Sequence, residues 1–405
     1  MSEESERSGT RGMGWRAVLN FGARRDPAGR LAGLPLAARA AAEAVAAGAS
    51  EIWLAVEKGE LPESLRSEME RICAGTRFRL VAARDVRNEL ELAGYPPTVR
   101  LFCDRYILLA GRLARFAGGD SARLQCGGEV VAERAGSGAE TAAEADVLDL
   151  ERPAAAARKV LEATTKPSDG IVSRWLNRPI SQRLSAVLLH IEGIRPWHLT
   201  IVTATMGLVM FVSFLQPGPG GLILGGILFH VASVVDGIDG EIARATHRSS
   251  ERGAMLDSAV DMVTNLLFYL GVTVSLARLY GPEHLLVGGW CLLLAIIGLL
   301  LIRMLANSAG DRGSFDIVKV HYRTRYPDGI PAKITNFLVA ITSRDFFAFG
   351  NALIILSGWG MLVTWLLAIF ATIWVAYILM AVPAILRTER SVDGVVAAPA
   401  ALTDI

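Results

Sequence analysis

One stretch decides the fold: Asp236-Gly-Ile-Asp239-Gly240-Glu-Ile-Ala243-Arg244, then eight residues, Gly253, three residues, Asp257, three residues and Asp261. The runs on either side of it, residues 222–235 and 262–276, are apolar enough to lie in a bilayer. A carboxylate at that depth costs several kcal/mol unless it is paired or bound to a cation. Acidic residues inside apolar sequence therefore indicate a functional site.

The spacing of the four aspartates sets them in two pairs. Asp236 and Asp239 are three positions apart, and Asp257 and Asp261 are four apart, so each pair shares one helix face. If the two faces meet, repulsion requires protons or divalent cations between the carboxylates. Hard oxygen ligands favour magnesium, manganese or calcium over zinc. Helix capping or surface salt bridges are the alternative, but the register of four acids with small residues and Arg244 favours a site.

The stretch resembles the full signature of the CDP-alcohol phosphotransferases, with every signature position filled from Asp236 to Asp261. The resemblance covers about residues 166–388 and implies a membrane enzyme with six transmembrane helices. Such enzymes cleave the pyrophosphate of a CDP-linked alcohol, pass the phospho-alcohol to a second alcohol and release CMP. The resemblance also implies a homodimer formed through the membrane half.

The resemblance implies a role for each signature residue. Asp236, Asp239 and Asp257 would be metal ligands, and Asp261 would share a metal and act as general base on the acceptor hydroxyl. The cofactor would be Mg²⁺ or Mn²⁺, as two ions. The residues implied to shape or contact the CDP moiety are Gly240, Ala243, Arg244 and Gly253. Where many relatives carry a Pro-Asn pair this chain has Pro196-Trp197-His198, so His198 or Thr200 is expected to replace that asparagine as a contact of the nucleotide, and Thr200 is the candidate CDP-binding residue.

The second half of the chain contains six apolar spans, each long enough for about 30 Å of hydrocarbon. They are residues 198–215, 221–246, 254–277, 284–305, 334–356 and 361–386. Lys and Arg gather before the first span and after the second, fourth and sixth, whereas the short connections at residues 216–220, 280–283 and 357–360 carry none. By the positive-inside rule, both termini and the active site are cytoplasmic. We expect an integral protein of the inner or plasma membrane.

The first half, residues 13–165, is predicted to be a soluble cytoplasmic α/β domain after a disordered tail, residues 1–12. Predicted strands cover residues 15–21, 51–56 and 78–83, predicted helices cover 36–47, 61–73, 96–117 and 153–165, and residues 135–146 are predicted to form a loop. This alternation indicates parallel βαβ units. The four cysteines show no metal or disulfide spacing and fit a reducing compartment.

This half is similar to nucleotidyltransferases of the sugar-nucleotide type, in Gly33-Leu-Pro-Leu36 followed by Arg39 and in the segment that ends at Trp53. A nucleoside triphosphate site needs a Gly-rich loop and a basic partner after the first strand. Here Asn20-Phe-Gly22-Ala-Arg24 has a single glycine, and no lysine precedes Leu34. A degenerate domain kept for stability, assembly or regulation is therefore predicted, with a working cytidylyltransferase as the alternative. Asp104 is either a surface residue or a remaining metal ligand.

The junction, residues 166–195, is basic and amphipathic, which is typical of a segment in the membrane interface. Its apolar side is formed by Trp175, Leu176, Ile180 and Leu184, and its basic side by Arg174, Arg178 and Arg183. We expect these arginines to point to water or to phosphate, and anionic lipid and a substrate phosphate are equal alternatives. The membrane domain proper is expected over residues 196–390, with a tail over 391–405.

Two more arginines are candidates for binding an acceptor phosphate. Arg323 lies in a basic loop, residues 307–333, whose charge alternatively serves only as a topology signal. Arg344 precedes Asp345 near the middle of the fifth span, so this pair should face the interior of the bundle. It either contacts an acceptor phosphate or forms a structural ion pair.

The substrates are predicted from a second resemblance. A nucleotidyltransferase-like half fused to this membrane half resembles bifunctional enzymes that make CDP-inositol and then di-myo-inositol phosphate phosphate. This implies an inositol phosphate acceptor, with CDP-inositol or CDP-diacylglycerol as donor. A phosphatidylglycerophosphate-type or other CDP-diacylglycerol-dependent synthase is the alternative.

Two other classes of protein are disfavoured. A membrane cation transporter would carry acids toward both faces of the membrane, whereas these acids cluster on one side. A catalytically dead scaffold would not require an intact signature. The net charge of +1 gives no indication of a nucleic-acid partner, and none is expected.

Overall fold

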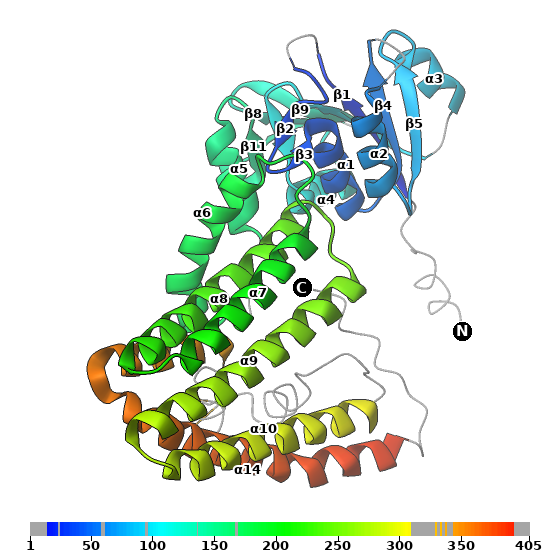
Figure 1. Cartoon of the computed structure of the whole chain (residues 1–405). Helices are drawn as coiled ribbons and strands as arrows, with labels where there is room; N and C mark the ends of the chain where they lie inside the picture. Colours follow the sequence, from blue (N-terminus) through cyan, green and yellow to red (C-terminus); the bar gives the residue numbers. More distant parts are fainter. Residues whose placement is uncertain are drawn as a thin grey trace. The chain divides into compact units, whose positions relative to one another are not determined.

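The computed structural model describes residues 14–22, 25–57, 61–93, 96–135, 137–166, 169–308 and 343–392, together with Gly329, Lys333 and Phe337. The chain divides into two units (Figure 1). One comprises the residues up to Thr164, Ser185–Ile194 and Ile242–Arg248; the other comprises Thr165–Leu184, Arg195–Glu241 and the residues from Ser249 onward. The predicted N-terminal tail, residues 1–12, and residues 393–405 of the predicted C-terminal tail, 391–405, lie outside the described residues.

The first unit is built on a seven-stranded mixed sheet with the order β10-β8-β9-β6-β1-β4-β5. Its strands are β1 (Trp15–Asn20), β4 (Ala49–Val56), β5 (Arg77–Ala82), β6 (Thr98–Phe102), β8 (Arg123–Cys126), β9 (Glu129–Arg134) and β10 (Ala139–Thr141). β1 pairs in parallel with β4 and β6, and β4 pairs in parallel with β5, which confirms the predicted βαβ units. The apolar run Ala17, Val18 and Leu19 is completely buried, as expected of a central strand covered on both faces.

Helices pack against this sheet, and two short strand pairs accompany it. The helices are α1 (Leu36–Ala46), α2 (Glu63–Ile72), α3 (Val86–Ala93), α4 (Ala110–Gly118) and α5 (Pro153–Glu162). The strand pairs are β2 (Arg30–Leu31) with β3 (Leu34–Pro35) and β7 (Tyr106–Leu108) with β11 (Val147–Asp149). Helix α1 contacts β1, β4, α2 and α4 (Figure 1). Its buried residues are mostly alanine, so it can approach the sheet closely.

Two sequence predictions in this unit are wrong. The helix predicted over residues 96–117 is instead β6, β7 and α4, because Val99 and Leu101 are buried at every second position, which is the period of a strand. The loop predicted over residues 135–146 contains β10 and a short 3₁₀ helix, η1 (Glu144–Asp146). The hairpin of β8 and β9, which turns at Gly127 and Gly128 with φ values of 56° and 83°, was not predicted.

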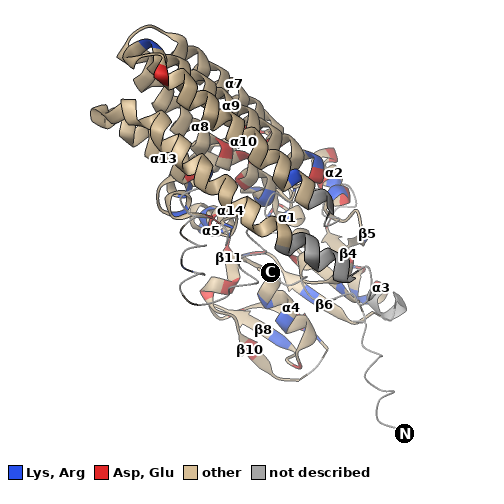
Figure 2. Ribbon diagram, turned by 90° about the horizontal axis from the view of Figure 1, so that it is seen from below, with Lys and Arg blue, Asp and Glu red and all other residues tan. Residues whose placement is uncertain are grey.

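The second unit is a bundle of long apolar helices. They are α7 (Pro196–Leu215), α8 (Pro219–Ala245), α9 (Glu251–Tyr280), α10 (Glu283–Ser308), α13 (Arg344–Ile354) and α14 (Val363–Val392), with the shorter elements η2 (Ser173–Asn177), α6 (Arg178–Leu188), η3 (Ile355–Trp359) and η4 (Gly360–Leu362). Within the described part of the chain, five helical segments are long and apolar enough to cross a membrane, the last running from Arg344 to Pro383. Lys, Arg, Asp and Glu occupy few positions along their described length (Figure 2). The chain is therefore an integral membrane protein.

The predicted spans can be compared with these helices one by one. The first four are α7 to α10, and the last two correspond to α13 and α14. The helical path between α13 and α14 is interrupted at Gly358. The φ of Gly358 is 83°, in the region that favours glycine. The break lies inside the predicted connection, residues 357–360. Most of residues 334–342, the first part of the predicted fifth span, lies outside the described residues.

An aromatic cluster fixes the packing of α7, α8 and α9. Phe268 on α9 is completely buried and stacks on Phe229 of α8, with 3.9 Å between ring centroids and 12° between ring planes. A Cβ on Gly225 or Gly271 would lie 2.5 Å or 2.8 Å from the ring of Phe214. Small residues thus let these helices approach closely, and the packing sets the register of the two helices that carry the signature aspartates.

Candidate active site

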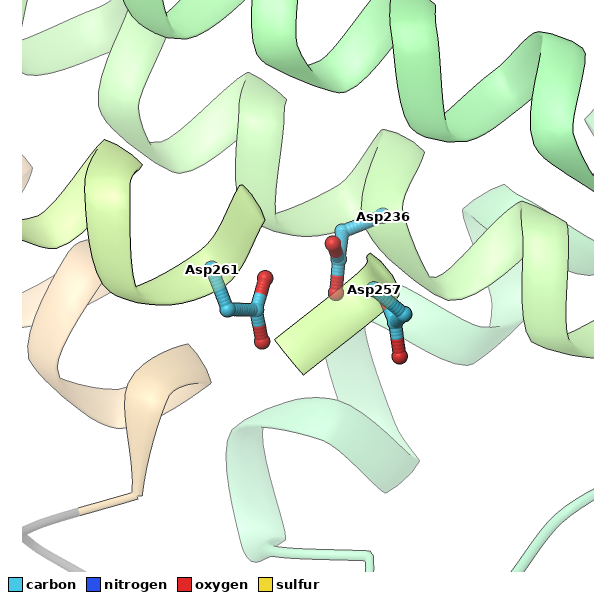
Figure 3. Close-up of side chains that lie close together, drawn as sticks. All are labelled: Asp236, Asp257 and Asp261. Atoms are coloured by element: carbon cyan, nitrogen blue, oxygen red, sulfur yellow. The ribbon is translucent and has the colours of Figure 1, made fainter. Parts of the chain in front are cut away.

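Three of the four signature aspartates meet in the membrane unit. Asp236 extends from α8, and Asp257 and Asp261 extend from α9 (Figure 3). One carboxylate oxygen of each residue lies within 4.8 Å of one carboxylate oxygen of the other two, and all three residues are partly buried. The two helices therefore bring three carboxylates, hereafter the aspartate trio, to one place.

The start of α9 is fixed by a side-chain cap. Ser250 has an extended backbone, and its Oγ accepts a hydrogen bond from the backbone N of Gly253 at 3.1 Å. This cap satisfies one of the free amides of the first turn. A Cβ on Gly253 would lie 3.0 Å from Ser250 Oγ, so glycine at this position leaves room for the capping hydroxyl. The cap sets Asp257 and Asp261 in the second and third turns, four positions apart on one face.

Arg344 lies against the aspartate trio. Its Nη1 is 2.6 Å from Asp236 Oδ2 and also contacts Asp261 Oδ1. Because one guanidinium faces carboxylates from two helices, it offsets part of their mutual repulsion. From the sequence, Arg344 is expected near the middle of the fifth span, residues 334–356. In the structure Ser343 has an extended backbone and α13 begins at Arg344, and most of the span before Ser343 lies outside the described residues.

Asp345, the neighbour of Arg344, accepts hydrogen bonds from other residues. Its Oδ1 accepts one from Asn177 Nδ2 and one from Ser233 Oγ, each 2.8 Å long. Arg344 and Asp345 thus have separate hydrogen-bond and ion-pair partners among the described residues, and the Arg344 guanidinium is directed to the aspartate trio. An acidic residue in the first turn also suits the positive end of the helix dipole.

Asp239, the fourth signature aspartate, is not among the three carboxylates that meet within 4.8 Å. Its side chain is buried, and its Oδ2 accepts a hydrogen bond of 2.7 Å from Thr200 Oγ1 on α7. From the sequence, Asp239 is expected to be a metal ligand and Thr200 to contact CDP. In the structure, Thr200 orients Asp239. His198, the alternative to Thr200, accepts a hydrogen bond at Nδ1 from the backbone N of Arg195 at 3.2 Å.

The aspartate trio fits a divalent cation. Asp257 Oδ1 is buried and has no hydrogen-bond partner among the described residues. Leaving a buried carboxylate oxygen unsatisfied costs free energy that a bound cation would recover. The donors are carboxylate oxygens alone, which suit hard cations of the magnesium and calcium type. Asp236, Asp257 and Asp261 are the residues that would hold such an ion.

The predicted phosphate-binding arginines have different surroundings. Arg174 is exposed on η2, and Arg323 lies outside the described residues. Arg178, expected to point to water or phosphate, is turned into the protein, where it forms ion pairs with Asp169 and Glu241 at 2.8 Å and 2.9 Å. An arginine with two such partners within its own unit is engaged by the protein rather than open to substrate.

The remaining signature residues lie on α8. Gly240 and Ala243 are partly buried. Arg244 belongs to the first unit, where its Nε donates a hydrogen bond of 2.8 Å to the carbonyl oxygen of Thr164. Glu241 is a residue that the sequence analysis did not select. Its side chain is completely buried. The sequence does carry a sign of this, because Glu241 has the apolar residues Ile238 and Ile242 near it on either side, and a buried carboxylate in apolar surroundings requires a partner.

These features define a class: an integral membrane protein whose helices carry an acidic site with a cationic neighbour. Residues 194–370 match the family model of the CDP-alcohol phosphatidyltransferases. Residues 194–370 therefore form a CDP-alcohol phosphatidyltransferase domain, which confirms the family resemblance of the signature.

Curated relatives extend this finding. A bifunctional IPC transferase and DIPP synthase of Thermococcus kodakarensis is 42% identical over 107 residues, which cover 26% of this chain and 23% of the relative. The protein of the same name from Rubrobacter xylanophilus is 32% identical over 241 residues, which cover 53% of this chain and 52% of the relative. An archaetidylinositol phosphate synthase of Pyrococcus horikoshii is 33% identical over 82 residues, covering 20% and 42%. The matched parts thus span about half or less of each of these relatives.

Proposed function

We propose that this protein transfers a phospho-alcohol from a CDP-alcohol to an acceptor alcohol and releases CMP. The observation that supports it most is the meeting of Asp236, Asp257 and Asp261, from two helices of a CDP-alcohol phosphatidyltransferase domain, with Arg344 beside them. Phosphoryl transfer needs positive charge around the pyrophosphate and a base for the attacking hydroxyl.

In this proposal Asp261 is the general base. An oxygen of its carboxylate takes the proton of the acceptor hydroxyl, the hydroxyl oxygen bonds to the phosphorus of the phospho-alcohol, and the bond from that phosphorus to the bridging oxygen breaks to release CMP. Asp236, Asp239 and Asp257, with Asp261, would hold two Mg²⁺ or Mn²⁺ ions. When bound, such ions offset the charge of the pyrophosphate and of the departing CMP. The part of Asp239 in this set depends on Thr200, which orients it.

We propose that Gly240, Ala243, Arg244 and Gly253 bind the CDP moiety. We propose that Arg344 binds the phosphate of the acceptor, with Arg174 and Arg323 as further contacts. Arg344 is supported by its place beside the trio. Its Nε and Nη2 are buried without hydrogen-bond partners among the described residues, so these donors can serve a phosphate.

The acceptor is proposed to be an inositol phosphate. The names of the relatives, which refer to IPC transferase, DIPP synthase and archaetidylinositol phosphate synthase, support this choice. CDP-inositol and CDP-diacylglycerol are both retained as donors, and a phosphatidylglycerophosphate-type synthase is the alternative. We further propose a homodimer in the inner or plasma membrane with six spans, cytoplasmic termini and a cytoplasmic active site, since Lys and Arg concentrate in alternate connections.

The test is an assay of CMP release by purified protein in detergent with Mg²⁺ or Mn²⁺. CDP-diacylglycerol and CDP-inositol are each offered with inositol 1-phosphate, glycerol 3-phosphate, serine and inositol. We expect one pair that includes inositol 1-phosphate to release CMP, and the release to disappear with chelator and in Asp261→Asn. Undiminished release in Asp261→Asn would remove Asp261 as base. Silence with every pair, together with no metal binding, would overturn the proposed function.

A further inference from the structure

The junction segment packs with its polar side inward. Ser173, Asn177, Arg178 and Ser181 are buried, whereas Trp175 on the same segment is 78% exposed. A segment in the membrane interface can leave apolar side chains exposed to lipid. Its buried polar groups, however, need partners inside the protein. Asn177, Arg178 and Ser181 each have a partner on α8 or α13, the helices that supply Asp236 and Arg344.

Arg178 is the centre of these contacts. Its Nε and Nη2 donate to the two carboxylate oxygens of Asp169 at 2.8 Å and 3.2 Å. Its Nη1 donates to Glu241 Oε1 at 2.9 Å and to the carbonyl oxygen of Gly237 at 3.3 Å. Ser181 Oγ donates to the same Glu241 Oε1 at 2.5 Å. The planar guanidinium thus connects the junction to one side of α8.

The residues that Arg178 contacts on α8 lie next to the signature aspartates. Gly237 follows Asp236 directly, and Glu241 is four positions from Gly237, so both lie on one face of the helix. A Cβ on Gly237 would lie 3.2 Å from Arg178 Nη1, so glycine at this position permits the approach. Because Arg178 holds this face, the rotation of α8 about its axis is fixed, and with it the direction in which Asp236 points.

The neighbouring residue makes the corresponding contact with α13. Asn177 Nδ2 donates to Asp345 Oδ1 at 2.8 Å, and Asp345 is adjacent to Arg344 in sequence. Two consecutive junction residues therefore hold the two elements whose side chains form the Arg344–Asp236 ion pair. Arg178 can have this effect without contacting the aspartate trio directly.

We propose that Arg178 is a positioning residue of the acidic site, which acts through Glu241 and Gly237 to orient Asp236. This inference rests on the proposed function only for its effect on catalysis, because its effect on metal binding is measurable without any substrate. It replaces direct binding of substrate phosphate as the role of Arg178.

The test compares Arg178→Ala, Glu241→Ala, the double variant and the milder pair Arg178→Lys and Glu241→Gln, each purified in detergent. Mn²⁺ affinity is measured by titration calorimetry or electron paramagnetic resonance, and CMP release is measured where the wild type shows it. Removal of groups that orient metal ligands typically lowers affinity or activity about 10- to 100-fold. We expect Arg178→Ala and Glu241→Ala each to weaken Mn²⁺ binding by such a factor, and the double variant to be no worse than either. Arg183→Ala, which removes an exposed arginine from the same helix, should change neither quantity.

Two results would overturn the proposal. A raised KM for the phosphorylated acceptor with unchanged Mn²⁺ affinity would mean that Arg178 binds substrate directly. A lowered unfolding temperature with unchanged Mn²⁺ affinity and unchanged kcat would mean a purely structural ion pair. If the alanine variants do not fold, Arg178→Lys and Glu241→Gln decide, with a smaller effect in the same direction. Absence of CMP release in the wild type would count against the proposed function alone, because the Mn²⁺ comparison is still measured.

Discussion

Nη1 of Arg344, the first residue of α13, lies 2.6 Å from Oδ2 of Asp236 on α8. The same atom contacts Asp261 on α9, so one cation connects three helices at the acidic site. In a bilayer an isolated charge is costly, and such residues face partners in the bundle interior. The contact therefore stabilises the bundle and also places a guanidinium at the site where we propose that an anionic substrate binds.

Replacing Arg344 should separate substrate binding from metal binding. We expect Arg344→Ala to lower kcat/KM for a phosphorylated acceptor by about 100-fold, the typical cost of losing one donor to a transition-state charge. Mn²⁺ affinity should stay equal or rise, because the carboxylates lose a competing cation. Steady-state kinetics and Mn²⁺ titration test this. The kcat/KM of Arg344→Lys is expected to lie between those of the wild type and Arg344→Ala. Arg303→Ala, an exposed arginine on α10, is the control. Weaker Mn²⁺ binding in Arg344→Ala would contradict the prediction.

Thr200 should matter through a single hydroxyl group. Thr200→Val keeps the shape of the side chain but removes the hydrogen bond of 2.7 Å to Asp239. Since a hydrogen bond to a charged group contributes about 1.5–3 kcal/mol, the variant should unfold at lower temperature and lose activity. Thr205→Val makes the same change at an exposed position of α7, where the hydroxyl donates a hydrogen bond to the backbone carbonyl oxygen of Ile201. Equal effects of the two substitutions would show that Asp239 does not depend on Thr200.

From the sequence, the meeting of Asp236, Asp257 and Asp261 could be predicted better than the contacts around them. Asp257 and Asp261 are four positions apart on one helix, and this local geometry alone sets them on one face. The direction of Asp239 depends on Thr200, which is 39 positions away. The inward turn of Arg178 likewise depends on Glu241, 63 positions away. Local periodicity carries no information about partners at such separations.

The same reason explains the errors in the α/β unit. Residues 96–117 contain enough apolar and helix-forming residues to suggest one helix, but Thr98–Phe102 is drawn into the sheet by pairing with β1 on one side and β9 on the other. Tertiary pairing overrides local propensity in such strands. By contrast β1, β4 and β5 were predicted close to their observed bounds, because buried parallel strands read as short apolar runs.

The aromatic cluster should limit the stability of the membrane unit. Phe268→Ala removes a completely buried ring that stacks on Phe229. Loss of a buried Phe costs about 3–5 kcal/mol, and we expect the lower end, because in a bilayer the loss is of packing rather than of transfer from water. Thermal unfolding in detergent is the measurement. Leu286→Ala, at a position that is 80% exposed, should leave the unfolding temperature nearly unchanged. Similar losses in both variants would contradict the importance of this cluster.

The ion pair of Asp169 with Arg178 should give a stability that depends on pH. Burial raises the pKa of Asp169, but hydrogen bonds and charge from Arg178 outweigh it and hold the pKa below its usual value. A carboxylate whose pKa is lower in the folded protein stabilises it above the unfolded pKa of about 3.9. This contribution is lost as the pH falls through the lower folded value.

We therefore expect Asp169→Asn to unfold at a lower temperature than the wild type at neutral pH. The difference in unfolding temperature between the two proteins should be constant down to about pH 5 and should become smaller below about pH 4. Unfolding temperatures of both proteins across this range test it, with the exposed Asp120→Asn as control. A gap that does not narrow at low pH would mean that the charge of Asp169 makes no contribution.

The α/β unit should not activate a sugar phosphate or inositol phosphate with CTP. In the loop after β1 the backbone N of Gly22, which could bind a phosphate, instead donates a hydrogen bond of 2.5 Å to Asp104 Oδ1. A carboxylate at this point also repels the phosphates of a nucleotide.

We expect no pyrophosphate and no CDP-inositol when the protein is incubated with CTP, inositol 1-phosphate and Mg²⁺, in the wild type and in Asp104→Asn alike. Pyrophosphate release by the wild type that disappears in Asp104→Asn would make Asp104 a metal ligand of a working cytidylyltransferase. The protein would then make its own donor, and CDP-inositol rather than CDP-diacylglycerol would be the substrate of the membrane unit.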